Sequence, residues 1–180
     1  YVVRPEGGDS NPGRLIAGEF DLATGEVGLG IRAGDPESIW RPHLAATLDD
    51  GRIVVAAGRL EPGGAAYRQQ VLVLARDGSS EVLLDYEDRL ANHPPQALYV
   101  APSGTIQVAV DRALSEIPAV GPHSEEPLTA ILSLVPGELP RQVGAFVLGD
   151  ENADRVLSIS STAEGLFACA RFRLGEGVPN

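Results

Sequence analysis

The sequence predicts an all-β protein built from repeated antiparallel sheets, and three observations support this prediction. Short runs rich in Val, Ile, Leu and Ala alternate with clusters of Gly, Pro, Asp and Ser at intervals of roughly 8–15 residues. Two kinds of glycine turn recur along the chain with a shared period. Helical signals are almost absent, because the two short candidates at residues 86–91 and 113–116 are followed by Pro94 and Pro118.

The first kind of turn joins two apolar strands through a glycine that follows Asp, Ser or Glu. Its copies lie in residues 44–57, 97–110 and, more loosely, 157–170, around Gly51, Gly104 and Gly165. These glycines are separated by 53 and 61 residues. We expect each of them to supply the positive φ that a two-residue hairpin turn requires.

The second kind of turn falls between copies of the first. It occurs in residues 16–27, 71–82 and 131–139, around Gly25, Gly78 and Gly137, which are 53 and 59 residues apart. Each period therefore holds four short strands joined by tight turns and longer links. A four-stranded antiparallel sheet repeated in this way is the form of a β-propeller blade.

We therefore predict antiparallel four-stranded blades of a β-propeller, with about three blades in one segment that spans the chain. The predicted repeats are residues 1–43, 44–96, 97–156 and, as a partial copy, 157–174. Because propellers close with four or more blades, we expect the ring to continue in further residues or in another copy of the chain. The alternative fold is a β-sandwich, which strands of this length also build.

A family resemblance points the same way. Residues 49–55, Asp-Asp-Gly-Arg-Ile-Val-Val, and residues 102–108, Pro-Ser-Gly-Thr-Ile-Gln-Val, resemble the turn-then-strand element of TolB-type and NHL-type propeller repeats. The third copy, at residues 163–167, departs from that element. Such families bind proteins, peptides, sugars or metals, or hydrolyse lactones, so the resemblance implies a fold and leaves the function open.

The composition excludes some partners. The 25 acidic residues outnumber 14 basic residues, all of them Arg, and the net charge is -11. Nucleic acids and anionic membranes require clustered basic residues, so neither is expected as a partner. The longest apolar runs, such as residues 97–101 and 166–170, are strand-sized, so no membrane-spanning segment is predicted. The single Cys169 lies in such a run, where we expect a buried, inert thiol.

The lack of Met and Lys suggests a processed product or fragment from a GC-rich bacterial genome. We expect an exported protein, periplasmic, extracellular or associated with the envelope, with the cytoplasm as the alternative. No catalytic motif with a known mechanism is present, so no catalytic residue is predicted and an enzyme is not the favoured interpretation. The alternative is a propeller hydrolase of the lactonase kind, or a metal-binding protein, that uses an acidic face bearing histidines.

That acidic face would form where the links between blades, at residues 33–42, 86–95 and 149–155, cross one side of a propeller. The candidate ligands of a divalent cation or another ligand are Glu37, His43, Asp88, His93 and Asp154. Carboxylates suit hard cations and imidazole suits transition metals. Solvated surface loops are the alternative interpretation of the same residues, and no organic cofactor is expected.

The favoured function is recognition or assembly, with another protein or further blades of the same protein as the partner. The loops at residues 59–68 and 112–127 are long enough to project from the sheets, and the second carries Glu116 and His123. Trp40 and Arg41 are further candidates, since an indole stacked with a guanidinium could hold a ligand. Mobile loops are the alternative interpretation of the two loops, and packing between blades is the preferred interpretation of Trp40.

Overall fold

The fold consists of strands joined by turns and loops. The structure, a computed structural model, describes residues 2–8, 10–26, 28, 30–87, 94–111, 128–147, 155–162 and 165–171. Within these residues no helix occurs, and the predicted all-β class is confirmed. The strands are β1 (Val2–Pro5), β2 (Leu15–Gly18), β3 (Ile31–Ala33), β4 (Ile39–Thr47), β5 (Ile53–Leu60), β6 (Arg68–Leu74), β7 (Ser80–Glu87), β8 (Ala97–Val100), β9 (Ile106–Asp111), β10 (Leu128–Leu134), β11 (Arg141–Val147), β12 (Arg155–Thr162) and β13 (Gly165–Arg171).

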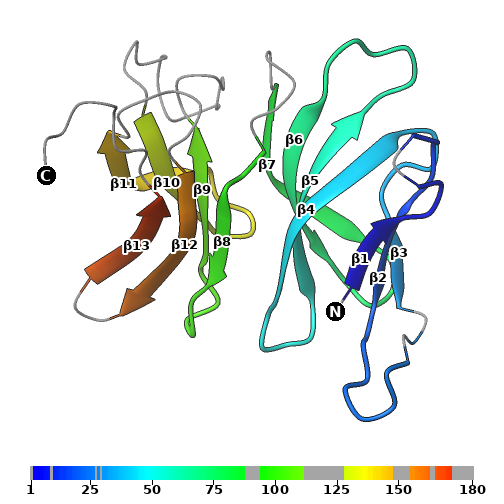
Figure 1. Cartoon of the computed structure of the whole chain (residues 1–180), viewed down its shortest axis with the longest axis horizontal. Coiled ribbons are helices and arrows are strands. Elements are labelled where there is room, and N and C mark those ends of the chain that lie inside the picture. The colour runs from blue at the N-terminus through cyan, green and yellow to red at the C-terminus, as the bar shows by residue number, and fades with distance from the viewer. Residues whose placement is uncertain are drawn as a thin grey trace, which may run out of the picture.

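The strands form four antiparallel sheets in chain order. The first sheet contains β1 to β3, the second β4 to β7, the third β8 to β11, and the fourth β12 and β13. Within every sheet each strand pairs with the strand next to it in the sequence. The first two sheets lie on the right of Figure 1 and the other two on the left. The described chain is therefore a series of antiparallel meanders.

At Gly51, Gly78 and Gly104 a glycine with positive φ closes a hairpin whose loop holds three residues, not the two that we expected at Gly51 and Gly104. At Gly51, where φ is 82°, the backbone N–H donates to the carbonyl of Leu48 at 2.9 Å. The N–H of Leu48 in turn donates to the carbonyl of Arg52 at 2.9 Å. Hydrogen bonds of the same pattern surround Gly78 and Gly104. The glycine is the last residue of a three-residue loop, where a left-handed residue completes the turn. Gly165 has a φ of 159° and does not share this conformation.

The second sheet is buried on both of its faces. In β5, Val54 and Ala56 belong to a core cluster shared with the third sheet. Ile53, Val55 and Ala57 of the same strand belong to a cluster shared with the first sheet. Because successive side chains of a strand point to opposite faces, a strand buried on both sides must be apolar throughout. This explains the uninterrupted apolar run of β5.

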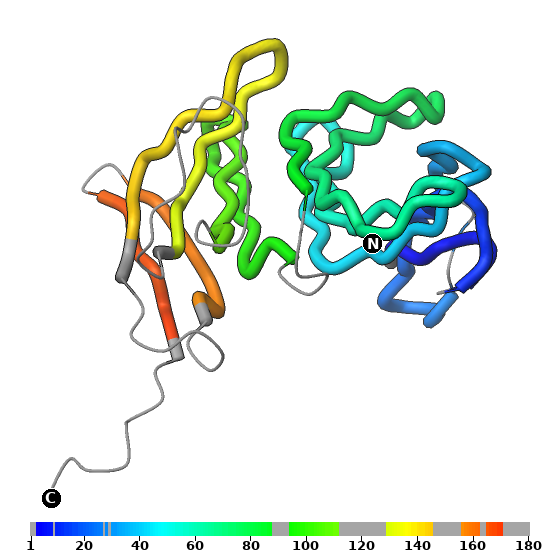
Figure 2. The backbone as a smooth tube through the Cα atoms, turned by 90° about the horizontal axis from the view of Figure 1, so that it is seen from above, coloured from blue at the N-terminus to red at the C-terminus, as the bar shows by residue number. Residues whose placement is uncertain are grey.

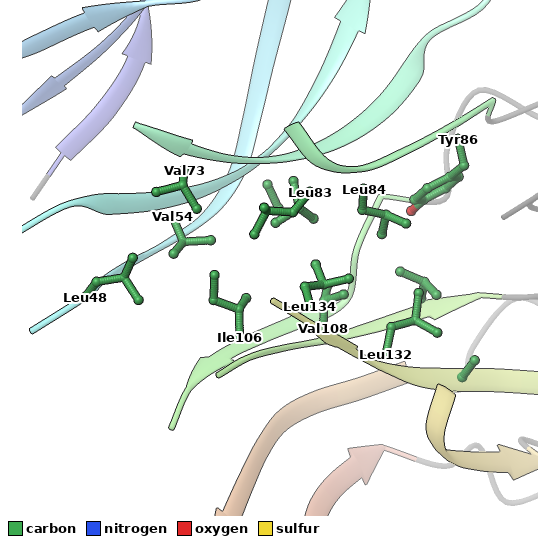
Figure 3. Close-up of a cluster of buried hydrophobic side chains, with 14 residues drawn as sticks. Leu48, Val54, Val73, Leu83, Leu84, Tyr86, Ile106, Val108, Leu132 and Leu134 are labelled. Atoms are coloured by element: carbon green, nitrogen blue, oxygen red, sulfur yellow. The ribbon is translucent and has the colours of Figure 1, made fainter. Parts of the chain in front are cut away.

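The core between the second and third sheets is the largest cluster, and Figure 3 shows the side chains of the two sheets facing each other. Each fully buried Leu or Ile contributes roughly 1.5–3 kcal/mol relative to an exposed side chain. This cluster therefore fixes the two four-stranded sheets against each other. Its labelled members are Leu48, Val54, Val73, Leu83, Leu84 and Tyr86 from the second sheet, and Ile106, Val108, Leu132 and Leu134 from the third.

Two further clusters join the outer sheets to this pair. Leu15 and Ile31 of the first sheet pack with Trp40 of the second. Ile131 of the third sheet packs with Val156 of the fourth. The sheets therefore stack face to face in chain order, and Figure 2 shows this order as a change of colour from blue on the right to orange on the left. The first strands of successive sheets lie next to one another. The strand β4 contacts β8, and β8 contacts β12.

Three expectations about individual segments are wrong. Cys169 is exposed and not buried, because it lies on the face of β13 opposite to Leu166 and Ala170, which pack against the third sheet. No described element covers that outer face. The predicted loop at residues 59–68 is shorter, because Arg59 and Arg68 are paired residues of β5 and β6. Tyr86 lies in β7 and does not begin a helical turn.

Candidate functional site

Four of the residues singled out from the sequence are described, and they lie where the link between the first two sheets enters β4. Glu37, Trp40, Arg41 and His43 lie at or near the start of β4 and are described. The other candidates lie outside the described residues: Asp88, His93, Asp154, Glu116 and His123. The geometry of the site is therefore that of the link before β4 and its surroundings.

Asp35 organises this link. Its Oδ1 accepts a hydrogen bond from the N–H of Glu37 at 3.0 Å, and its Oδ2 accepts one from the Ser38 hydroxyl at 2.8 Å. Oδ2 also accepts a hydrogen bond from Arg59 Nη2 at 2.9 Å. The N–H of Glu37 is the main cause that lowers the pKa of Asp35, and the Ser38 hydroxyl and the Arg59 guanidinium lower it further. The carboxylate is thus engaged in holding the link in place.

Trp40 belongs to the core. Its side chain is 2% exposed and lies between the first and second sheets. Its Nε1 donates to the backbone carbonyl of Asp35 at 3.0 Å. Gly34 has a φ of 86°, and a Cβ built on it would lie 2.8 Å from Trp40 Cζ2. The structure therefore gives the indole the packing role that the sequence left open, and its surface is not available to a partner.

Arg41 points to the opposite face of β4 and stacks on a different aromatic ring. Its Cζ lies 4.5 Å from the centroid of the Tyr67 ring. Adjacent residues of a strand point to opposite faces, so Trp40 and Arg41 do not form a combined grip on a ligand. The guanidinium nearest to Trp40 is that of Arg59, whose Cζ is 5.7 Å from the indole centroid.

His43 lies beside the Arg41–Tyr67 pair. It is the extra residue of a β-bulge, because Pro42 pairs with Ala57 and Leu44 pairs with Ala56. Such bulges redirect a side chain and often occur near functional sites.

Gly58 of β5 is the residue that pairs with Arg41 of β4. A Cβ on Gly58 would lie 3.3 Å from Tyr67 Cδ1 and 3.4 Å from His43 Nε2. The missing side chain therefore lets both rings approach the backbone of β5. We call Arg41, His43, Gly58 and Tyr67 the Gly58 patch. Within it, Arg41 and His43 are exposed and Tyr67 is half-buried.

The structure does not bring Glu37 and His43 together. Glu37 lies in the turn built on Asp35, and His43 follows the first four residues of β4. Four residues of a strand span roughly 13 Å, which is too far for two ligands of one ion. Asp88, His93 and Asp154, the other residues proposed for that cation, lie outside the described residues.

A second polar cluster lies close to the first. Arg68 Nε donates to Asp85 Oδ1 at 2.8 Å, and Gln70 Nε2 donates to Asp85 Oδ2 at 3.1 Å. Gln70 is 3% exposed, so this hydrogen bond satisfies a buried polar group. Both Asp35 and Asp85 therefore bind an arginine of the same chain and serve the structure of the sheet.

The described residues contain no group of three or more His, Cys, Asp or Glu side chains placed to hold a metal ion. None of the described segments forms a helix of the length and apolar character needed to cross a membrane. Tyr67 was missed by the sequence analysis, since it is remote from Arg41 in the chain. Its proximity to Gly58 follows from the register of β5 with β6, and its proximity to Arg41 also requires the register of β4 with β5.

Comparison with known proteins identifies no relative. No family model matches the chain, and searches of curated proteins and of solved structures find no match. The function must therefore be inferred from the geometry of the chain itself.

Proposed function

We propose that the chain is a segment of a β-propeller and serves as a non-catalytic module for recognition or assembly. Three features of the described sheets support the propeller. Each sheet is an antiparallel meander, the second and third have four strands, and the sheets stack in chain order. The contacts of β4 with β8 and of β8 with β12 resemble those of inner strands around an axis. A sandwich would instead pack two sheets on each other.

The outer face of the fourth sheet supports continuation of the ring. Leu157 and Phe167 are 57% and 52% exposed, and no described element lies on that face or pairs with the free edge of β13. An unpaired edge strand is a template for further pairing. In this proposal, further blades of the same protein or another copy cover the outer face.

The main support for a recognition role is the geometry of the Gly58 patch. Arg and Tyr are enriched among the residues that dominate the binding energy of protein interfaces. Stacking on Tyr67 fixes the orientation of Arg41, so little conformational entropy is lost when a partner binds. The carboxylates of Asp35 and Asp85 bind Arg59 and Arg68, whereas Arg41 is exposed and stacks on the half-buried Tyr67.

The test is quantitative affinity capture from an extract of the source cells. The immobilised chain is compared with an Arg41→Ala, Tyr67→Ala double variant and with Arg32→Ala as a matched control. Arg32 is also an exposed arginine, but it lies in β3 of the first sheet, outside the Gly58 patch. We expect at least one captured protein to be depleted about tenfold or more by the double variant and to be retained by the control.

The proposal fails if the two variants capture the same proteins in the same amounts. Circular dichroism and urea unfolding of each variant must show an unchanged fold. A captured protein that is depleted equally by the control would also count against the Gly58 patch. Its depletion would then follow from the loss of any positive charge, and not from the loss of this patch.

A further inference from the structure

A cleft lies at the end of the molecule opposite to the Gly58 patch, between the second and third sheets. Its volume is about 400 Å³, within the range of roughly 300–1,000 Å³ that is typical of ligand sites. The hairpin turns of β4–β5 and β8–β9 and the turn after β10 form its walls. The lining residues are Leu48, Asp49, Asp50, Arg52, Pro102, Ser103, Gly104, Thr105, Val135 and Pro136.

The walls of the cleft are fixed before any ligand binds. The two hairpin loops are each closed by two backbone hydrogen bonds of 2.8–2.9 Å. Glu81 Oε1 of β7 accepts a hydrogen bond from the N–H of Gly137 at 3.0 Å, which fastens the third wall to the second sheet. Pro102 and Pro136 stiffen their turns further. A site with such a rigid backbone loses little entropy on binding.

The charges of the cleft leave one carboxylate uncompensated. Asp50 Oδ2 accepts a hydrogen bond from Arg52 Nε at 2.8 Å, so these two charges neutralise each other. Nearby Arg76 pairs with Glu19 of the neighbouring turn at 3.7 Å. Asp49 is exposed and forms no ion pair with any of the described residues. The cleft therefore carries one net negative charge, in a chain whose net charge is -11.

The remaining lining combines apolar and hydroxyl groups. Leu48, Pro102, Val135 and Pro136 offer apolar surface. The Ser103 hydroxyl donates to Thr105 Oγ1 at 3.0 Å, which leaves lone pairs on both oxygens as acceptors. An aliphatic stem that ends in a cationic, multiply donating head group complements this surface. Arginine is the side chain that best meets these requirements.

We propose that the cleft binds an arginine side chain from an extended segment of a partner protein, with Asp49 as the main acceptor. This inference rests on the proposed recognition role and assigns it a second contact, at the turn end of the second and third sheets. The acidic chain would also attract a basic segment over longer distances and accelerate its association.

The test is an NMR titration of the full chain, labelled with ¹⁵N, with the peptide acetyl-Gly-Gly-Arg-Gly-Gly-amide. The same peptide with citrulline is the neutral isosteric control. We expect the arginine peptide to shift the amide signals of Gly51, Gly104 and Thr105, with a dissociation constant of roughly millimolar order. We expect Asp49→Asn to weaken binding about fivefold or more. Glu26→Gln, which removes a carboxylate outside the cleft, should leave binding unchanged.

The inference is overturned if the arginine peptide does not shift these amides at 20 millimolar, a concentration roughly tenfold above the expected constant. It is also overturned if the citrulline peptide binds equally well, or if Asp49→Asn has no effect. The proposed function has a separate readout, because partner capture is tested through Arg41 and Tyr67 at the other end of β4. Loss of the titration with capture intact removes this inference alone, and the reverse result removes the recognition role of the Gly58 patch alone.

Discussion

Asp35 and Arg59 are joined by a hydrogen-bonded ion pair of 2.9 Å, although 24 residues separate them in the sequence. The pair fastens the link between the first two sheets to the C-terminal end of β5. Because Asp35 also binds the Glu37 N–H and the Ser38 hydroxyl, one carboxylate determines how the chain passes from one sheet to the next.

Replacing Asp35 by Ala should therefore lower the free energy of unfolding by about 1–2 kcal/mol. The side chains of Asp35 and Arg59 are 34% and 24% exposed, so solvent screening keeps the loss modest. Glu61→Ala is the matched control, because Glu61 contacts the same guanidinium at 3.5 Å but is 54% exposed. Urea unfolding should show a change below about 0.5 kcal/mol for the control. Equal losses in the two variants would show that Asp35 does not organise the link.

Gly34→Ala should destabilise the protein more than Gly25→Ala. Both glycines have positive φ, which costs an alanine about 1–2 kcal/mol. A Cβ at Gly25 meets no atom within 4 Å, whereas one at Gly34 would lie 2.8 Å from the Trp40 ring. The difference between the two variants in thermal unfolding measures the steric contact with Trp40. Fluorescence of this single tryptophan should also change in Gly34→Ala only.

Acid should weaken the turns. The pKa values of four aspartates are lowered by hydrogen bonds that favour the charged form. The first donors are the backbone N–H groups of Ala23 for Asp21, Glu37 for Asp35 and Arg52 for Asp50, and the Ser79 hydroxyl for Asp77. A lowered folded-state pKa means that the folded chain binds protons less readily than the unfolded chain. The stabilisation is thus complete well above pH 3.8, the ordinary value, and is lost as the pH falls through the folded-state values.

The comparison that tests this effect is the wild type against the Asp50→Asn, Asp77→Asn double variant. The wild type should be more stable at pH 7, and the urea midpoints of the two proteins should converge as the pH falls below 3.8. Asparagine can still accept the turn hydrogen bonds but does not titrate. A constant difference over this range would mean that the hydrogen bonds do not depend on the charge of these carboxylates.

Cys169 provides a probe of the outer face of the fourth sheet. In the isolated chain its thiol is exposed and should react with a maleimide at a rate close to that of an unfolded peptide. If further blades or another copy cover this face, the thiol should react at least about tenfold more slowly in the native assembly than in the isolated chain. Equal reaction rates in the native assembly and in the isolated chain would show that no further blade or second copy covers β13.

The sequence predicted the parts of the fold that depend on local chemistry. The glycines at residues 25, 51, 78, 104 and 137 all have positive φ, because Gly alone adopts this conformation without strain. The length of the loops was not predicted, since a left-handed glycine serves both two-residue and three-residue loops.

Features that depend on contacts between distant segments were missed. Cys169 lies in an apolar run, but its burial depends on whether a neighbouring sheet covers that face. The stacking of Arg41 on Tyr67 depends on the register of β4 with β5 and on the loop that follows Leu60. The opposite orientations of Trp40 and Arg41, by contrast, follow from the two-residue period of a strand once β4 is recognised.

The central claim is that the four stacked sheets belong to a closed propeller. The most direct test is the mass of the native protein, isolated from its source under non-denaturing conditions. The proposal predicts a particle heavier than the 18.9 kDa of this chain, either a longer polypeptide with further blades or several copies that close a ring. A stable monomer of 18.9 kDa would contradict the closed propeller and would show that the outer face of β12 and β13 needs no neighbour.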